Sequence, residues 1–224
     1  MPGGRGKLPV LAEISGPVAG AEGHWALRAE DLERLGPLRE RLDGHRMLLV
    51  TGADDPARIL ATTVASLAAA GGRRTALLDC DLARPRLAAD LGLAPTPGLH
   101  EYLRWEATPP EILQTLVLAG PASGAGEPLV CISAGRDARD PRTLLGLQSF
   151  RHMATKLRSA YELVVFAGPG LGEGEGSLPA LAAQADGLLA AIAPGQDAGR
   201  SGRELRAALG RLAVTPLGAV VVSG

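Results

Sequence analysis

The sequence predicts an α/β protein built on a doubly wound, mainly parallel β-sheet of about six to eight strands flanked by helices. Three observations carry this prediction. Short apolar runs of strand length recur along the chain, stretches of helix length separate them, and glycine or proline marks most boundaries. A hydrophobic content of 46% in 224 residues supports one sizeable core. We therefore expect a flexible tail over residues 1–7 and a single domain over residues 8–224.

The clearest unit is a strand, a helix and a second strand. Residues 47–51 form a short, largely apolar run typical of a buried strand, and residues 56–70 form an Ala-rich helix that Gly71-Gly72 ends. A βαβ unit is right-handed and places the carboxyl ends of both strands at the same edge of the sheet. Ligands bind at that edge in such sheets, so we expect residues 52–58 and 79–84 to line one crevice.

The other segments alternate in the same way. Gly36-Pro37 interrupts a helical spacing of leucines in residues 25–42, which predicts two short helices or a kinked one. Asp140 precedes Pro141 and is the expected N-cap of a long helix. The remaining predicted strands are 8–14 (an edge strand), 116–118, 129–132, 163–166, 188–193 and 217–222, and the remaining helices are 85–91, 99–105, 110–114, 142–159, 178–184 and 203–212.

Charge and composition narrow the class of partner. The chain has 23 basic and 24 acidic residues, a formal net charge of −1, and 3% aromatic residues, which argues against a nucleic-acid partner. Cys80 and Cys131 fall in or beside predicted buried strands, so we expect core thiols in a cytosolic protein. We see no apolar run of the ~20 residues that a transmembrane helix needs.

The loop after the first strand of the βαβ unit lacks the groups that bind phosphate in a P-loop. There, glycine N–H groups surround the phosphates, a lysine reaches the terminal ones, and a Ser or Thr holds Mg²⁺. Residues 52–58 contain one glycine, Gly52, and no lysine. Asp55 followed by Pro56 is a typical helix start, so we expect the Asp55 carboxylate to cap the N–H groups that would otherwise bind an anion. Arg58 is a candidate cation, although it matches the lysine poorly.

The segment after the second strand carries a recognisable motif. Residues 79–85 read Asp-Cys-Asp-Leu-Ala-Arg-Pro, followed by Leu-Gly-Leu at 91–93 and Pro-Gly-Leu at 97–99. This series resembles the bacterial tyrosine kinases, the cytoplasmic kinase-like domains of capsule and exopolysaccharide chain-length systems. Those kinases belong to the deviant Walker ATPases, with the partition and division-site ATPases. The resemblance implies a P-loop NTPase-like fold of that type.

The resemblance spans nearly the whole chain. Residues 8–14 are similar to the segment that follows the last membrane helix in fused members of the family. Later motifs of the family are matched in order by Ala134-Gly135, Asp140-Pro141, Leu144-Leu145, residues 161–170, Ala185-Asp186-Gly187 and residues 218–221.

Several ATP-handling groups of the family are missing. The loop lacks Gly-Lys-Ser/Thr, Ala167 stands where the family has a magnesium-side aspartate, and the arginine of the Asp-x-Asp-x-Arg motif falls one position late, at Arg84. The resemblance implies that Asp79 and Asp81 would hold Mg²⁺ or accept a proton. The alternative is that these two aspartates cap the next helix or pair with Arg84 and Arg86.

An early helix carries part of the family's ring interface. The family uses Glu-x-x-Arg-x-x-Arg there, and this chain has Glu33-x-x-Gly36-x-x-Arg39. Glu33 and Arg39 are therefore candidate interface residues. A charged solvent face is the alternative.

The joint loss of the lysine, the hydroxyl ligand and the acid predicts a catalytically inactive relative of the kinases, because phosphoryl transfer depends on positioned positive charge. We expect no cofactor and a regulatory or interaction role in capsule or exopolysaccharide biosynthesis. The expected setting is the cytoplasm, at the inner face of the membrane, reached through a partner or a segment absent from this sequence. The expected partners are a membrane polysaccharide co-polymerase or further copies of the chain.

Two alternatives stay open. One is an active protein-tyrosine kinase that binds ATP and Mg²⁺ through an altered loop, with Gly52, Arg58 and Arg84 on the nucleotide and Asp79 and Asp81 on the metal. The other is a partition-type ATPase relative.

Overall fold

The computed structural model describes residues 8–15, 18–19, 25–26, 34–116, 127–172, 175–196 and 199–223. The strands are β1 (Val10–Ser15), β2 (Val18–Ala19), β3 (Trp25–Ala26), β4 (Met47–Gly52), β5 (Thr75–Asp79), β6 (Gln114–Leu116), β7 (Leu129–Ile132), β8 (Leu163–Ala167), β9 (Gly187–Ile192) and β10 (Pro216–Ser223). The helices are α2 (Gly36–Leu42), α3 (Asp54–Ala70), α4 (Leu87–Leu91), α5 (Leu99–Leu103), α6 (Pro109–Ile112), α7 (Pro141–Gly146), α8 (Gln148–Ala160), α9 (Leu178–Ala182) and α10 (Gly199–Leu209), with a 3-10 turn, η2 (Glu175–Ser177).

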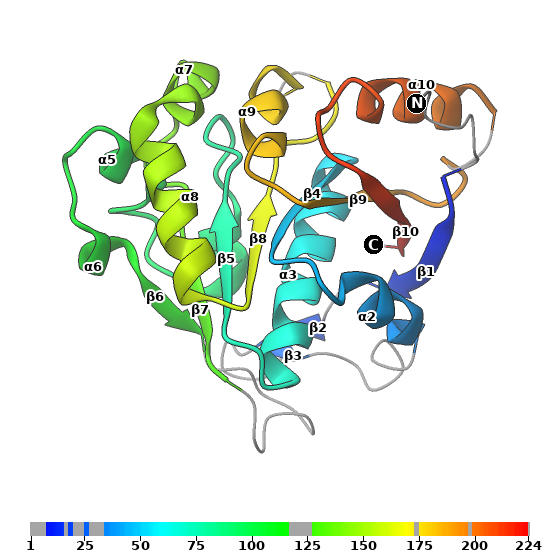
Figure 1. Ribbon diagram of the computed structural model, residues 1–224, viewed down its shortest axis with the longest axis horizontal. Helices are drawn as coiled ribbons and strands as arrows, with labels where there is room; N and C mark the ends of the chain where they lie inside the picture. The colour runs from blue at the N-terminus through cyan, green and yellow to red at the C-terminus, as the bar shows by residue number, and fades with distance from the viewer. Residues whose placement is uncertain are drawn as a thin grey trace.

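Eight strands form one sheet in the order β1-β10-β9-β4-β8-β5-β7-β6 (Figure 1). Every neighbouring pair is parallel except β6 with β7, which is antiparallel. The predicted doubly wound, mainly parallel sheet is confirmed, and β1 is the edge strand that the sequence predicts. Strands β2 and β3 form a separate antiparallel pair.

Helices cover both faces of the sheet, as the doubly wound prediction requires. Alternate residues of β4 belong to two apolar cores: Leu48 and Val50 to one, Met47 and Leu49 to the other. Helices α2, α3 and α4 pack in the first core, and α5, α6, α7, α8, α9 and α10 contribute to the second. All residues of β4, β5, β8 and β9 are buried. Two-sided burial explains why these strands are apolar runs rather than alternating ones.

Three predicted helices differ in the structure. The helix predicted over 110–114 ends at Ile112, and Gln114 begins β6. Trp25 and Ala26 lie in β3, so the helical segment predicted over 25–42 is wrong at its start. Arg34 is helical, Leu35 is a turn and α2 begins at Gly36, so the interruption falls close to where Gly36-Pro37 predicts it. The predicted helix 142–159 is broken between α7 and α8, because Leu147 adopts an extended conformation with φ −65° and ψ 152°. The predicted cap is confirmed: the Asp140 carboxylate accepts a 3.1 Å hydrogen bond from the Thr143 N–H.

Two predicted features fall partly or wholly outside the described residues. The tail over 1–7 lies outside them, as do residues 117 and 118 of the strand predicted at 116–118. The single domain over residues 8–224 stays a prediction.

Candidate functional site

The carboxyl ends of β4, β5 and β8 meet at the edge of the sheet where the sequence predicts a crevice. Strand β4 passes into α3 through a single residue, Ala53. Gly52 has φ +140°, and a Cβ atom on it would lie 2.0 Å from the carbonyl oxygen of Ala191 on β9. The Ala53 N–H donates to the same oxygen at 2.9 Å. The turn therefore needs glycine for its packing, and β9 holds the turn in place.

The expected helix cap at Asp55 is wrong. Helix α3 begins at Asp54, with Ala53 at the N-cap position in an extended conformation. The one-residue connection starts the helix earlier than the Asp-Pro pattern predicts, so Pro56 is the third helical residue. Both aspartates still lie in the first turn, where the partial positive charge of the helix favours carboxylates.

The first aspartate of α3 is bound by an arginine from the loop after β5. Arg84 donates from Nη1 to Asp54 Oδ2 and from Nη2 to Asp54 Oδ1, both at 3.0 Å. Its Nε atom also lies 3.8 Å from Asp81 Oδ2. Paired bonds of this kind fix the orientation of both groups. The predicted cation Arg84 thus links the start of α3 to the Asp-x-Asp segment.

The second aspartate of α3 is bound by the other predicted cation. Arg58 Nη1 donates to Asp55 Oδ1 at 2.8 Å, and Arg58 Nε donates to Asp90 of α4. The hydrogen bond from Arg58 lowers the pKa of Asp55 below its ordinary value. Arg86 is also close to Asp55, with its Nη1 atom 3.9 Å from Asp55 Oδ1. The three arginines that line this edge therefore all face carboxylates of the chain itself.

Asp79 serves the backbone at the end of β5. It is 3% exposed, and it accepts the Asp81 N–H at Oδ1 and the Leu87 N–H at Oδ2, both at 3.2 Å. Leu87 is the first residue of α4, so the Asp79 carboxylate caps that helix. Burial raises the pKa of Asp79 to about 7. This is the capping geometry that the sequence left open as the alternative to a metal site.

Asp79 and Asp81 are the residues best placed for a divalent ion. Asp81 is partly buried, which raises its pKa, and the nearby Arg84 opposes that shift. Asp79 lies opposite Ala167 in the β5–β8 ladder, so β8 presents a methyl group there. Within the described ranges, no group of three His, Cys, Asp or Glu side chains is arranged to hold a metal. A Mg²⁺ ion would have two carboxylates, one of them already bonded to two N–H groups, and would need water for its other positions.

The loop after β8 closes over the β4–α3 junction. Thr51 Oγ1 donates to the Pro169 carbonyl at 2.7 Å, and the Leu171 N–H donates to the Gly52 carbonyl at 2.8 Å. A Cβ atom on Gly170 would lie 1.7 Å from Asp54 Oδ1, so this glycine lets the loop approach the aspartate.

The cavity that remains has a volume of about 230 Å³. That is below the ~300–1,000 Å³ usual for small-molecule sites. It does bring together the predicted residues Arg58, Asp79, Asp81 and Arg84, whereas Gly52 lies outside its lining. The lining residues are Asp54, Asp55, Arg58, Asp79, Asp81, Arg84, Arg86, Ala167, Gly168 and Gly170.

A second cavity, of about 430 Å³, lies on the other side of the junction, between β9 and α10. Sequence reasoning missed it, because its walls come from separate segments without a motif. It is lined by Gly52, Ala53, Leu171, Gly172, Ala191, Ile192, Gln196, Glu204, Leu205, Ala208 and Arg211.

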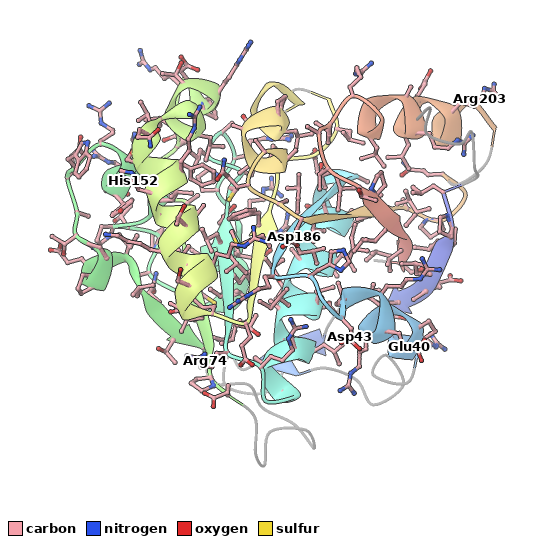
Figure 2. The ribbon with its side chains drawn as sticks, in the orientation of Figure 1. Glu40, Asp43, Arg74, His152, Asp186 and Arg203 are labelled. Carbon is pink, nitrogen blue, oxygen red and sulfur yellow. The ribbon has the colours of Figure 1, made fainter. Side chains whose placement is uncertain are left out.

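The candidate interface is only half described. Arg39 is exposed in the last turn of α2, next to Glu40, which Figure 2 labels together with Asp43 on the same side of the molecule. Glu33 lies outside the described residues, so the pair stays a prediction. In the part of the chain that the structure describes, no helix combines the length and apolar character needed to span a membrane.

Solved structures share this architecture. The kinase domain of the Escherichia coli tyrosine kinase ETK is 18% identical over 96% of this chain and 90% of that chain, with a TM-score of 0.75. The BceF tyrosine kinase domain is 19% identical over 96% and 93%, with a TM-score of 0.73. The chain has the fold of the bacterial tyrosine kinase domains.

A structure with a lower TM-score is cobyrinic acid a,c-diamide synthase from Mycobacterium smegmatis with bound ADP and magnesium. It is 23% identical over 79% of this chain and 73% of that chain, with a TM-score of 0.55. The expected resemblance and the P-loop NTPase-like fold are thus confirmed at the level of the fold. No protein-family model matches the chain, and no curated protein does.

Proposed function

We propose that this chain is a catalytically inactive relative of the bacterial tyrosine kinases that acts by protein contact. The observation that carries the proposal is the β4–α3 junction. A P-loop curves around a phosphate over several residues, whereas here Ala53 alone joins the strand to the helix. The connection is too short to surround a phosphate with N–H groups.

The charges at the junction support the same proposal. A triphosphate would meet Asp54 and Asp55 in the first turn of α3, where a P-loop offers a lysine and a hydroxyl group. To reach Arg58 or Arg84, it would first have to displace these carboxylates from their arginines. Phosphoryl transfer relies on cations that are free to contact the phosphates, and this edge holds its cations in internal pairs.

The biological role that we propose is regulatory, in capsule or exopolysaccharide assembly at the inner face of the membrane. The motif series and the shared fold with ETK and BceF support it. The proposed partner is a membrane polysaccharide co-polymerase or another copy of the chain.

Calorimetry with Mg·ATP on the full chain tests the first part. We expect no heat of binding up to about 1 mM nucleotide, with the ETK kinase domain as the positive control. Binding at micromolar concentrations would overturn the proposal.

An active kinase with an altered loop is the second candidate, favoured by the survival of Asp79 and Asp81 beside a cavity that arginines line. Incubation with ATP labelled at its terminal phosphate distinguishes the two. A label on the chain that disappears in Asp79→Asn would support this candidate, and its absence in both proteins would reject it.

A further inference from the structure

Trp105 is placed in a way that the isolated chain does not explain. Its side chain is 81% exposed. Its φ angle is +65°, a left-handed value that no other non-glycine residue shows in the described ranges. Bulky L-residues rarely adopt this conformation, and glycine is the usual residue at this position after a helix. Both the backbone strain and the exposed ring cost stability, so a gain elsewhere should offset them.

The backbone around Trp105 is well held. The Trp105 N–H donates to the Tyr102 carbonyl at 3.0 Å, and the Glu106 N–H donates to the Glu101 carbonyl at 2.8 Å. These bonds end α5 and direct the indole outward. The exposure of the ring is therefore built into the turn.

Other exposed apolar residues follow at once. Pro109 and Pro110 are exposed at the start of α6, and Leu113, 40% exposed, comes directly after that helix. Pro109 and Leu113 are four residues apart, so they lie on one face of the helical turn. We call Trp105, Pro109, Pro110 and Leu113 the Trp105 ledge. Scattered exposed apolar residues are ordinary, but clusters of them mark contact surfaces.

Four charged side chains beside the Trp105 ledge are paired with one another. Arg104 Nε contacts Glu106 Oε1 at 2.7 Å, and Arg136 Nε contacts Glu101 Oε1 at 2.8 Å. Arg136 also contacts Glu106. Two arginines and two glutamates thus balance one another, while Glu111, exposed on α6, adds one carboxylate to each rim and should make association weaker at low salt.

The ledge leads directly into the last strand of the sheet that the structure describes. Leu113 precedes β6, the last strand in the sheet order, and β6 pairs only with β7 among the described strands. Figure 1 shows α5, α6 and β6 together at one side of the molecule, opposite the edge formed by β1. The outer side of such a strand carries backbone N–H and C=O groups that can pair with another strand.

We propose that this edge binds a second copy of the chain. In that dimer, β6 pairs antiparallel with β6 of the other copy about a two-fold axis, and each Trp105 packs against the other ledge. A two-fold axis brings the same patch of both copies together, so apolar side chains meet apolar side chains and the outer backbone groups of β6 meet an identical set. The ledge has four residues and β6 has three, far fewer than the ~20–30 residues per partner of a stable interface, so the association should be weak and concentration-dependent.

Sedimentation and tryptophan fluorescence between about 10 µM and 1 mM test the proposal. The chain has two tryptophans, so Trp25→Phe leaves Trp105 as the only indole. We expect the average mass to rise with concentration and the Trp105 emission to shift to shorter wavelength as the ring is buried.

Trp105→Gly is the decisive variant, because glycine fits the left-handed turn and removes the ring. We expect association to weaken about tenfold or more while the melting temperature stays equal or rises. A ring needed only for folding would instead give a lower melting temperature.

Leu113→Glu should also weaken association, since it brings two carboxylates together across the axis. Val10→Glu on β1, where Val10 is 45% exposed, is the matched control and should leave association unchanged. The proposal is overturned if the chain is monomeric up to 1 mM, if Trp105→Gly associates as the parent does, or if only Val10→Glu disrupts the dimer. None of these results bears on nucleotide binding.

Discussion

Replacing Asp79 by asparagine should change how stability depends on pH. The folded chain holds the Asp79 pKa at about 7, against an ordinary value of 3.8. The folded state therefore binds more protons than the unfolded state between these two values. The contribution of Asp79 to the free energy of unfolding is fully present below pH 3.8 and is lost as the pH rises to about 7. A difference of about three pKa units corresponds to roughly 4 kcal/mol.

The asparagine side chain of the Asp79→Asn variant would carry no charge but would accept one N–H group fewer. The N–H group left without an acceptor, at either Asp81 or Leu87, should cost roughly 1–3 kcal/mol because it is buried and would face the asparagine NH2 group. We therefore expect Asp79→Asn to be slightly less stable than the parent at about pH 4.5 and more stable, by roughly 1–3 kcal/mol, at about pH 8.5.

Urea denaturation at closely spaced pH values measures this difference, with the exposed Asp43→Asn as a control for the loss of one charge. Subtracting the parent curve removes the contributions of the other carboxylates. A difference that stays constant between about pH 4.5 and 8.5 would refute the reasoning, because it would mean that Asp79 titrates alike in both states.

Three further predictions concern stability and are measured by the same denaturation assay. Gly52→Ala should destabilise the fold by about 3 kcal/mol or more, since its Cβ would lie 2.0 Å from a carbonyl of β9; Gly146→Ala, with no atom within 4 Å of its Cβ, is the control. Arg84→Ala should cost less than about 1 kcal/mol because its ion pair is half exposed, and a larger loss would show that the pair is worth more than surface pairs usually are. Asp140→Ala should cost about 1 kcal/mol and Asp140→Asn much less, because asparagine keeps a capping oxygen; equal losses would contradict the capping role.

The fold was predictable from the sequence because its central strands are buried on both faces. Residues 47–51 and 163–166 had to be largely apolar, and their length distinguishes them from helices. The break at Leu147 was not predictable, because the flanking residues continue a helical pattern and one extended residue interrupts it. At Trp25, the leucine spacing suggested a helix, whereas the structure has a strand.

The sequence predicted where the site lies, but it did not predict the ion pairs within the site. The strand ends of the βαβ unit identified Arg58, Asp79 and Asp81 as neighbours, because topology alone brings them together. The bond between Arg84 and Asp54 joins residues 30 positions apart, and no local pattern encodes such a pairing. The motif comparison showed only that the arginine is displaced by one position.

The length of the β4–α3 junction limits what substitution alone can do. Ala53 is fixed to β9 through its N–H group, and the first turn of α3 is fixed to the loop after β5 through Arg84. New side chains at Asp54 or Asp55 would alter the charge but leave the main chain as short as before. Engineering a nucleotide site here would therefore require inserted residues, and each insertion would have to shift α3 along the sheet or bulge outward above Gly170.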